Sequence, residues 1–294
     1  MRQRGAAFLI VLWLLALLAV VLGGFALIAR SERLMARHLL DGTQARYAAE
    51  AGVHRAVYAL ALPDPTQRWL PDGRPYRIRW HDFDIEIRIV DESGKIDLNA
   101  VDPGLLERFF KVHGVEPEHA AALASAVVDW RDPDDLLTPN GAEDRQYEQA
   151  GLGYGAKDAP FDLVSELQQV LGMNHELYRR IEPALTINSG LSMPNPAFAQ
   201  ADVLQALGDF DPALVQQLIE QRHAWTPTGG TAPPVLPDGT PIVASAGGGT
   251  YSIMSRARMK SGAFAELDTV VRLGGAAASG LAFAVLRWQD GSPP

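Results

Sequence analysis

The segment DWRDPDDLLTPNGAEDRQYEQ, residues 129–149, carries the densest group of side chains that could bind a ligand. Its prolines and glycine indicate a loop, and Arg131 is the one base opposing the acids between positions 129 and 144. Hard cations such as calcium take about six to eight oxygen ligands from carboxylates, amide side chains and carbonyls. A bound cation would remove the mutual repulsion of these acids and order the loop. The candidate calcium ligands are Asp129, Asp132, Asp134, Asp135, Asn140, Glu143 and Asp144.

The spacing of these acids is not that of an EF-hand. Asp132 and Asp134 begin a D-x-D pattern, but Leu136 and Leu137 stand where a further ligand and the glycine belong. The other interpretation is an acidic, solvated loop whose carboxylates cap neighbouring helices. Composition alone leaves both interpretations open.

No part of the sequence has the residue spacing of a known catalytic motif. The chain lacks the H-E-x-x-H and G-x-S-x-G motifs. It has no cysteine, so thiol nucleophiles, thiolate metal sites and disulfides are excluded. Its seven histidines are scattered, and the GLGYGAKD segment (Gly151–Asp158) lacks the P-loop pattern and indicates a turn. We therefore expect a protein that is not an enzyme.

The N-terminal segment predicts a retained transmembrane helix. Residues 6–29 contain no charge, and a helix of that length measures about 36 Å, enough for a hydrocarbon core of about 30 Å. A secretory signal has a shorter apolar core and ends at a small-residue cleavage site, whereas here apolar residues resume after Gly24. Arg2 and Arg4 precede the span, so the positive-inside rule places the N-terminus in the cytoplasm.

The elements that must position the acidic run are a long helix, strands and short helices. Apolar spacing extends the first helix to about Leu62, where Pro63 and Pro65 end it. Short helices are predicted from about 96 to 222, followed by a loop rich in proline and glycine. Since a two-stranded hairpin alone is marginal in water, we expect one α+β fold with the helices inserted between strands of a single sheet. Alternating apolar residues predict these strands at 76–80, 83–92, 251–259, 263–274 and 281–290.

Three places in the helical block repeat the order helix, glycine, helix. Their glycines, Gly114, Gly172 and Gly208, are candidate C-caps. Helix-hairpin-helix units bind nucleic acid through backbone amides and basic residues at the turn, but here the turns are acidic. The net charge of −9 also argues against a nucleic-acid surface. A membrane-anchored DNA receptor and an anchored periplasmic enzyme are the alternatives, and we favour neither. The turn acids are Glu116, Glu118, Glu176, Asp209 and Asp211.

The leader RQRG, followed at once by AAFLIVLWLLALLAVV, resembles a type IV prepilin signal. The resemblance implies that a prepilin peptidase cuts after Gly5 and that the new N-terminus, Ala6, is methylated. The fifth residue of the mature chain is then Ile10. Most pilin-like proteins have a glutamate there, which pairs with the N-terminal amine of the neighbouring subunit.

Three further segments, DESGKIDLNAVDP, DWRDPDDLLTPNGAEDRQY and FDLVSELQQVLGM, resemble signatures of the GspK family. This family comprises the large minor pseudopilins of type II secretion systems, which lack the glutamate and carry a large helical insertion. The resemblance spans nearly the whole chain. It implies a pilin-like fold, calcium in the inserted domain, and a tip complex with GspI and GspJ. GspH and the major pseudopilin GspG are further expected partners, and nucleic acid is not.

The resemblance also implies a role and a location. The protein would initiate or cap the pseudopilus for protein export across the outer membrane, because a bulky head cannot repeat along a narrow filament. It would cross the bacterial inner membrane once, with a cytoplasmic N-terminus and a periplasmic head. The disulfide seen in some members cannot form here. The expected divisions are a leader (1–5), the transmembrane helix (6–29), the first pilin-like part (30–96), the inserted helical domain (97–222), and the loop with C-terminal strands (223–294).

Overall fold

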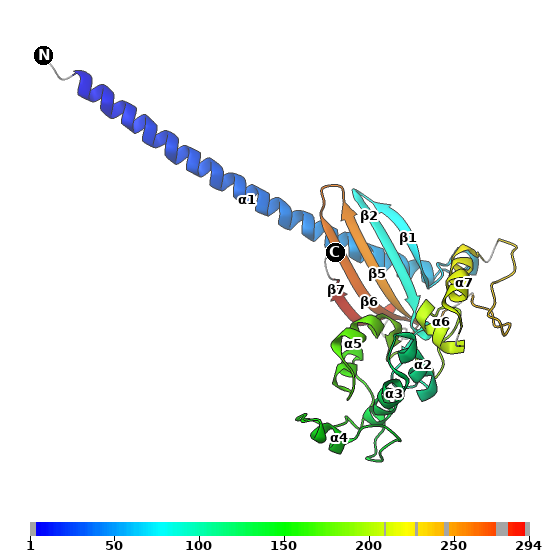
Figure 1. Ribbon diagram of the computed structural model, residues 1–294. Helices are drawn as coiled ribbons and strands as arrows, with labels where there is room; N and C mark the ends of the chain where they lie inside the picture. The colour runs from blue at the N-terminus through cyan, green and yellow to red at the C-terminus, as the bar shows by residue number, and fades with distance from the viewer. Residues whose placement is uncertain (1–3, 209, 227–228, 244–246, 275–281, 292–294) are drawn as a thin grey trace.

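The computed structural model describes residues 4–208, 210–226, 229–243, 247–274 and 282–291, and its first element is one long helix. This helix, α1, spans Arg4–Leu60 and projects far beyond the rest of the protein (Figure 1). Its N-terminal half is exposed, and by length and composition it is apolar enough to cross a membrane. Gly5 and Ala6 lie in its first turns, and the Ile10 side chain is exposed.

The second half of α1 packs on a sheet through small side chains. Alanines on its inner face are fully buried, together with Val53, and short side chains let the helix approach the strands closely. Gly52 marks the tightest point, because a Cβ there would overlap the Ser255 hydroxyl. The buried alanines of this face are Ala45, Ala48, Ala49 and Ala56.

Five antiparallel strands form the sheet, in the order β1-β2-β5-β6-β7. In the second strand, residues 83, 85, 87 and 89 are buried and the residues between them face outward, as the alternation predicts. An antiparallel sheet with one covered and one solvated face has this pattern. His81 takes a left-handed φ of 51° in the turn between the first two strands. The strands are β1 (Asp72–Trp80), β2 (Phe83–Asp91), β5 (Thr250–Met259), β6 (Phe264–Leu273) and β7 (Phe283–Asp290).

Between β2 and β5 the chain builds a second core from helices. It leaves the sheet at Asp91 and returns beside it, since Asp91 pairs with Tyr251. Phe109, Phe110 and Tyr147 are among the fully buried residues of this second core. The helices are α2 (Pro103–Val112), α3 (Pro117–Arg131), α4 (Asp144–Gln149), α5 (His175–Ile181), α6 (Ala201–Gly208) and α7 (Pro212–Ala224). Helices α2–α5 lie beyond the end of the sheet, whereas α7 lies beside the edge strand β1 (Figure 1). Helices α3 and α4 are among the parts farthest from the free end of α1.

The pilin-like α+β fold predicted from the sequence is confirmed, but local details of the helical block differ. Residues Val164–Gln169 form a 3₁₀ helix, η3, where the sequence predicts an α-helix. Glu166 accepts hydrogen bonds from the backbone N–H groups of Asp162 and Leu163, which tightens this turn. Strands β3 (Ile96–Asp97) and β4 (Leu185–Thr186) form a parallel pair, too short to give a periodicity signal.

The three glycines expected to cap helices have two different roles. Gly114 and Gly172 have left-handed φ values of 81° and 91°, as a C-cap requires. Gly208 instead ends α6 without a left-handed backbone. The ring of Phe210 covers it, and a Cβ would overlap that ring. Glycine is needed at position 208 because the Phe210 ring leaves no space for a side chain. The prediction of Gly208 as a left-handed C-cap was therefore wrong.

Candidate functional site

The acidic loop between α3 and α4 is built around the buried carboxylate of Asp129. This residue lies in the last turn of α3 and is fully buried. Its Oδ1 accepts hydrogen bonds from the Thr138 backbone N–H, at 3.2 Å, and from the Thr138 hydroxyl. Gly141 lies against the same carboxylate, where a Cβ would overlap it, and Asn140 has a left-handed φ of 65°. The loop is thereby folded back onto the end of α3.

Three carboxylate oxygens beside this loop are buried and have no hydrogen-bond partner among the described residues. They are Oδ1 of Asp132, Oε1 of Glu143 and Oδ1 of Asp158. A buried charge without a partner destabilises the folded chain. Arg131 forms no ion pair with these three residues, because its guanidinium donates to the carbonyl oxygens of Leu98 (2.6 Å) and Val101 (2.9 Å). These oxygens are therefore left free to bind a cation.

Burial and mutual repulsion make these acids resist ionisation. Burial, and then the charges of Asp129 and Asp158, raise the pKa of Glu143 to about 7. Burial and the neighbouring carboxylates also raise the pKa of Asp132 and that of Asp158. A divalent cation would supply the missing opposite charge to all three groups. The donor set of the site thus fits a hard cation that prefers oxygen.

The structure brings only some of the predicted ligands together. Asp129, Asp132 and Asp135 lie close enough to Glu143 for their charges to raise its pKa, whereas Asn140 is exposed. Asp134 caps the Leu136 backbone N–H at 2.9 Å, and Asp135 and Asp144 lie near Asp158. Within the described part of the chain, no three His, Asp or Glu residues are already arranged as ligands around one point.

Sequence reasoning missed Asp158. The residue pattern of Gly151–Asp158 predicts a turn, and nothing in the residue order places this segment against the acidic loop. Asp158 has a left-handed φ of 52°, and a Cβ at Gly155 would overlap the Asp144 carboxylate. That close approach brings the turn back to the start of α4. A left-handed aspartate is uncommon, but this signal is visible only in the backbone.

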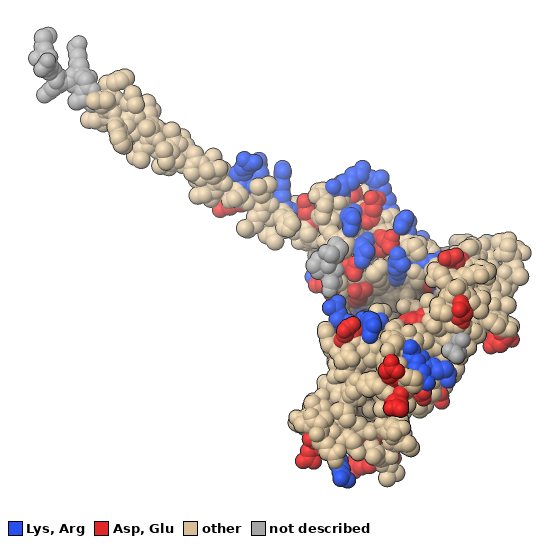
Figure 2. Space-filling view, viewed as in Figure 1, with Lys and Arg blue, Asp and Glu red and all other residues tan. Residues whose placement is uncertain are grey.

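Charge divides the chain into two parts. Residues 97–222 contain 21 Asp and Glu against 8 Lys and Arg, a net charge of −13, whereas the rest contains 14 against 18, a net charge of +4. In Figure 2, basic side chains gather on the exposed face of the sheet and on α1. The helix-hairpin-helix turn before α7 uses its acid to cap its own helix, since Asp211 accepts from Ala213 N–H at 2.8 Å. These features do not favour the nucleic-acid alternative.

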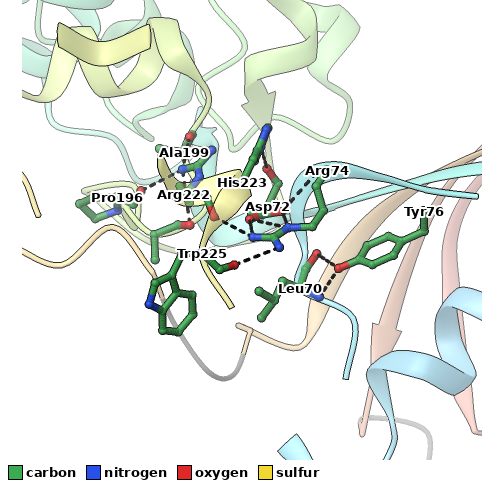
Figure 3. Close-up of polar contacts among 10 residues, drawn as sticks. Leu70, Asp72, Arg74, Tyr76, Pro196, Ala199, Arg222, His223 and Trp225 are labelled. Atoms are coloured by element: carbon green, nitrogen blue, oxygen red, sulfur yellow. Dashed lines mark hydrogen bonds and ion pairs between the residues drawn. The ribbon is translucent and has the colours of Figure 1, made fainter. Parts of the chain in front are cut away.

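A buried polar network ties α7 to the edge strand β1 (Figure 3). Arg222 of α7 is 2% exposed, and its Nη1 donates to the Ala199 carbonyl oxygen at 2.8 Å. Arg74 of β1 donates to the carbonyl oxygens of Arg222 (2.8 Å) and Trp225 (3.3 Å), and pairs with Asp72 at 2.7 Å. A cation at a helix C-terminus is favourable. Burial lowers the pKa of Arg222 to about 10.

A second buried cluster joins the start of the helical block to the middle of the sheet. Lys95 Nζ lies 2.6 Å from Glu92 Oε1, and both residues are buried. Glu92 also accepts from the hydroxyls of Ser252 and Thr186, which belong to β5 and β4. Together with the Arg74 network, this cluster holds the helical block in one orientation on the sheet.

An apolar helix that continues into the core of an antiparallel sheet defines the class of pilin-like proteins. Within that class, the family model described as type II secretion system (T2SS), protein K, matches residues 87–190. The chain is 31% identical to type II secretion system protein K of Klebsiella pneumoniae over 256 residues, covering 76% of each chain. It is 27% identical to the protein of the same name from Pectobacterium carotovorum subsp. carotovorum over 250 residues, covering 75% of this chain and 76% of that one.

A solved structure, the GspK-GspI-GspJ complex of the enterotoxigenic Escherichia coli type 2 secretion system, contains a chain of the same fold. Its TM-score is 0.61 at 18% identity, and the match covers 88% of this chain and 100% of that one. The chain therefore belongs to the family of type II secretion system K proteins. Its role is that of a minor pseudopilin, a structural component of the secretion system.

Proposed function

We propose that this minor pseudopilin occupies the tip of the pseudopilus, where it initiates or caps assembly for protein export across the outer membrane. The observation that carries the proposal is the position of the helical block. Helices α2–α5 extend the head beyond the end of the sheet, on the side away from the free end of α1 (Figure 1). A head enlarged on this side leaves no room for another subunit stacked on it, so it fits only at the end of a filament.

The N-terminus supports the same role. Residues 1–5 have the character of a prepilin leader, and cleavage after Gly5 by a prepilin peptidase would leave a methylatable Ala6. Ile10 then stands where the expected glutamate would pair with a neighbouring amine. An apolar residue cannot make that ion pair, so this subunit lacks an interaction that would stabilise its addition on top of an earlier subunit. An initiator has no earlier subunit beneath it.

Partners and location follow from the same proposal. The GspK-GspI-GspJ complex of the structural relative supports GspI and GspJ as direct neighbours. GspH and the major pseudopilin GspG would lie farther along the filament. The span of α1 would cross the bacterial inner membrane once, with its N-terminus in the cytoplasm and the head in the periplasm.

Cysteine crosslinking along the assembled pseudopilus tests the tip position, since the native chain has no cysteine. We expect the native subunit to form crosslinks to GspI and GspJ only. In a separate secretion assay, the Ile10→Glu variant should export protein as the native subunit does. Deletion of residues 97–222 should let the shortened subunit crosslink along the filament. A deletion variant that stays at the tip would contradict the argument from bulk.

Mass spectrometry of the N-terminus of protein from an intact host tests the prepilin assignment. A methylated Ala6 is the expected first residue. An intact Met1 on the assembled protein would contradict it.

We further propose that the acidic loop binds calcium. Asp132, Glu143 and Asp158 would hold the ion through their unpartnered oxygens, with Asp129 supporting the loop. The ion would supply the positive charge that this group of acids lacks and fix the loop against α3. Its role would be structural.

Thermal unfolding of the full chain in detergent, with calcium or with a chelator, tests this proposal. Calcium should raise the unfolding temperature of the native chain, and magnesium should raise it less, because magnesium demands a stricter geometry. Asp158→Asn should remove most of the calcium effect, while the exposed turn variant Asp82→Asn should keep it. A calcium effect that survives Asp158→Asn would exclude this site.

A further inference from the structure

Three arginines form a stripe on α1 directly after the apolar span. The uncharged segment ends at Ala29, and Arg30, Arg33 and Arg37 follow it. At about 100° of rotation per residue, these three positions lie within about 60° of one another around the helix. Figure 2 shows basic side chains gathered on α1 between the bare apolar rod and the head. The arginine stripe, meaning these three residues, is therefore one continuous basic face.

The arginine stripe has no partner within the described chain. All three side chains are exposed, and none forms an ion pair or hydrogen bond with a described residue. By contrast, Arg46 two turns farther along pairs with Glu50 (3.6 Å) and Asp290 (3.3 Å). Glu32 lies on the opposite side of the helix, and Asp41 follows Arg37 by one turn at the upper end of the stripe. Three exposed guanidinium groups on one face, without a partner among the described residues, form a site that an anionic group from outside the chain can bind.

The depth of the arginine stripe identifies this partner as lipid phosphate. At a rise of 1.5 Å per residue, the stripe occupies roughly 2–12 Å of helix above the last uncharged residue. The polar headgroup layer of a bilayer adds roughly 5–8 Å on each side of its hydrocarbon core. Long arginine side chains bend toward the interface and cover the remaining distance. A protein partner would have to enter the lipid headgroup layer to compete with lipid phosphate for these arginines.

We propose that Arg30, Arg33 and Arg37 bind the phosphate groups of anionic phospholipids in the leaflet on the side of the head. The inference rests on the proposed function only in requiring that α1 spans the membrane. Each basic residue near an anionic surface contributes roughly a fivefold preference, so three contribute up to roughly a hundredfold at low salt. Screening by salt weakens this preference.

The arginine stripe also determines where the mature chain is anchored. Cleavage after Gly5 would remove Arg2 and Arg4, leaving no charged side chain between the new N-terminus and Arg30. All charged side-chain contacts with lipid would then lie at one end of the span.

Native mass spectrometry of the full chain in detergent, with equal phosphatidylglycerol and phosphatidylethanolamine, tests the inference. The native chain should retain phosphatidylglycerol preferentially. The triple variant Arg30→Gln, Arg33→Gln, Arg37→Gln should lose up to roughly a hundredfold of that preference at low salt, while the triple Lys variant keeps most of it. A matched control, Arg145→Gln, Arg179→Gln, Arg180→Gln, removes three exposed arginines of the helical block and should bind as the native chain does.

Equal lipid preference in the native chain and the triple Gln variant would overturn the inference. So would a triple Gln variant that keeps its lipid but loses an acidic partner subunit, because the stripe would then be a protein contact. Alkaline carbonate extraction distinguishes the two levels of failure. A native chain released from membranes would refute the span and the inference together. A chain retained in membranes without lipid preference would refute the inference alone.

Discussion

Replacing Glu143 by Gln separates two effects of this side chain. One is the destabilisation of the folded chain by its buried negative charge, and the other is its proposed binding of calcium. In the folded chain the pKa of Glu143 is about 7, against an ordinary value of 4.5. Because the folded value is higher, folding favours the protonated form, and stability falls as pH rises from 4.5 through 7. The full difference corresponds to about 3 kcal/mol, and solvent screening in a surface loop reduces it to about 1–3 kcal/mol.

Calcium reverses the sign of this effect, because the ion binds the ionised carboxylate. At pH 8 with a chelator, E143Q should be more stable than the native chain by about 1–3 kcal/mol, or about 2–12 °C in unfolding temperature. At pH 5 without calcium the two chains should differ little. Saturating calcium should stabilise the native chain more at pH 8 than at pH 5, and should stabilise E143Q less. Circular dichroism of the full chain in detergent measures these changes.

Glu148→Gln provides the matched control, since Glu148 is an exposed residue of α4, the short helix that Glu143 immediately precedes. It should change neither the pH dependence nor the calcium response. If E143Q proved less stable than the native chain at pH 8 with a chelator, the argument from burial and repulsion would be refuted. Equal calcium stabilisation at pH 5 and pH 8 would refute the coupling to the carboxylate.

Four further substitutions test packing and the ties between the two cores, each by urea unfolding of the full chain. Gly52→Ala forces a methyl group onto the Ser255 hydroxyl and should lower the free energy of unfolding by about 1–3 kcal/mol. At Gly42 no atom lies within 4 Å of an added Cβ, so Gly42→Ala should raise it by about 0.5–1 kcal/mol. Arg222→Met removes the donor to three buried backbone carbonyl oxygens and should cost about 2–4 kcal/mol; an unchanged midpoint would show that this network contributes nothing. Asp97 Oδ2 accepts from two backbone N–H groups, at 2.9 and 2.7 Å, so Asp97→Asn should cost about 1–3 kcal/mol, and a variant as stable as the native chain would contradict this.

The sequence predicted the parts of the fold that depend on periodicity. The long helix and strands β2, β5 and β6 follow apolar patterns that extend over nine residues or more. The alternation in β1 covers only residues 76–80, and the strand itself begins earlier, at Asp72. The insertion of the helices between strands was predictable because a lone hairpin is marginal in water. These inferences need only the local spacing of apolar residues and the fact that an isolated two-stranded hairpin is marginally stable.

The remaining features depend on contacts between distant segments, which a single sequence does not specify. Asp158 reaches the acidic loop only because the turn around Gly155 packs on Asp144. Arg131 adjoins the acids in sequence, yet its guanidinium is bound to the carbonyl oxygens of residues 98 and 101. Composition therefore identified the acidic loop, while the contribution of Asp158 depends on a tertiary contact.

The pairing of β2 with β5 has a consequence for the order in which the chain folds. Asp91 and Tyr251 are neighbours in the sheet although some 160 residues separate them. Closing a disordered loop of that length costs about 4–5 kcal/mol in chain entropy. If the helical block folds first, its compact core brings the end of β2 and the start of β5 near each other. The contacts within the helical block then compensate most of the entropy lost on closing the loop. Folding would then proceed from the middle of the chain outward, and the inner edge of β2 would stay unpaired until β5 had been synthesised.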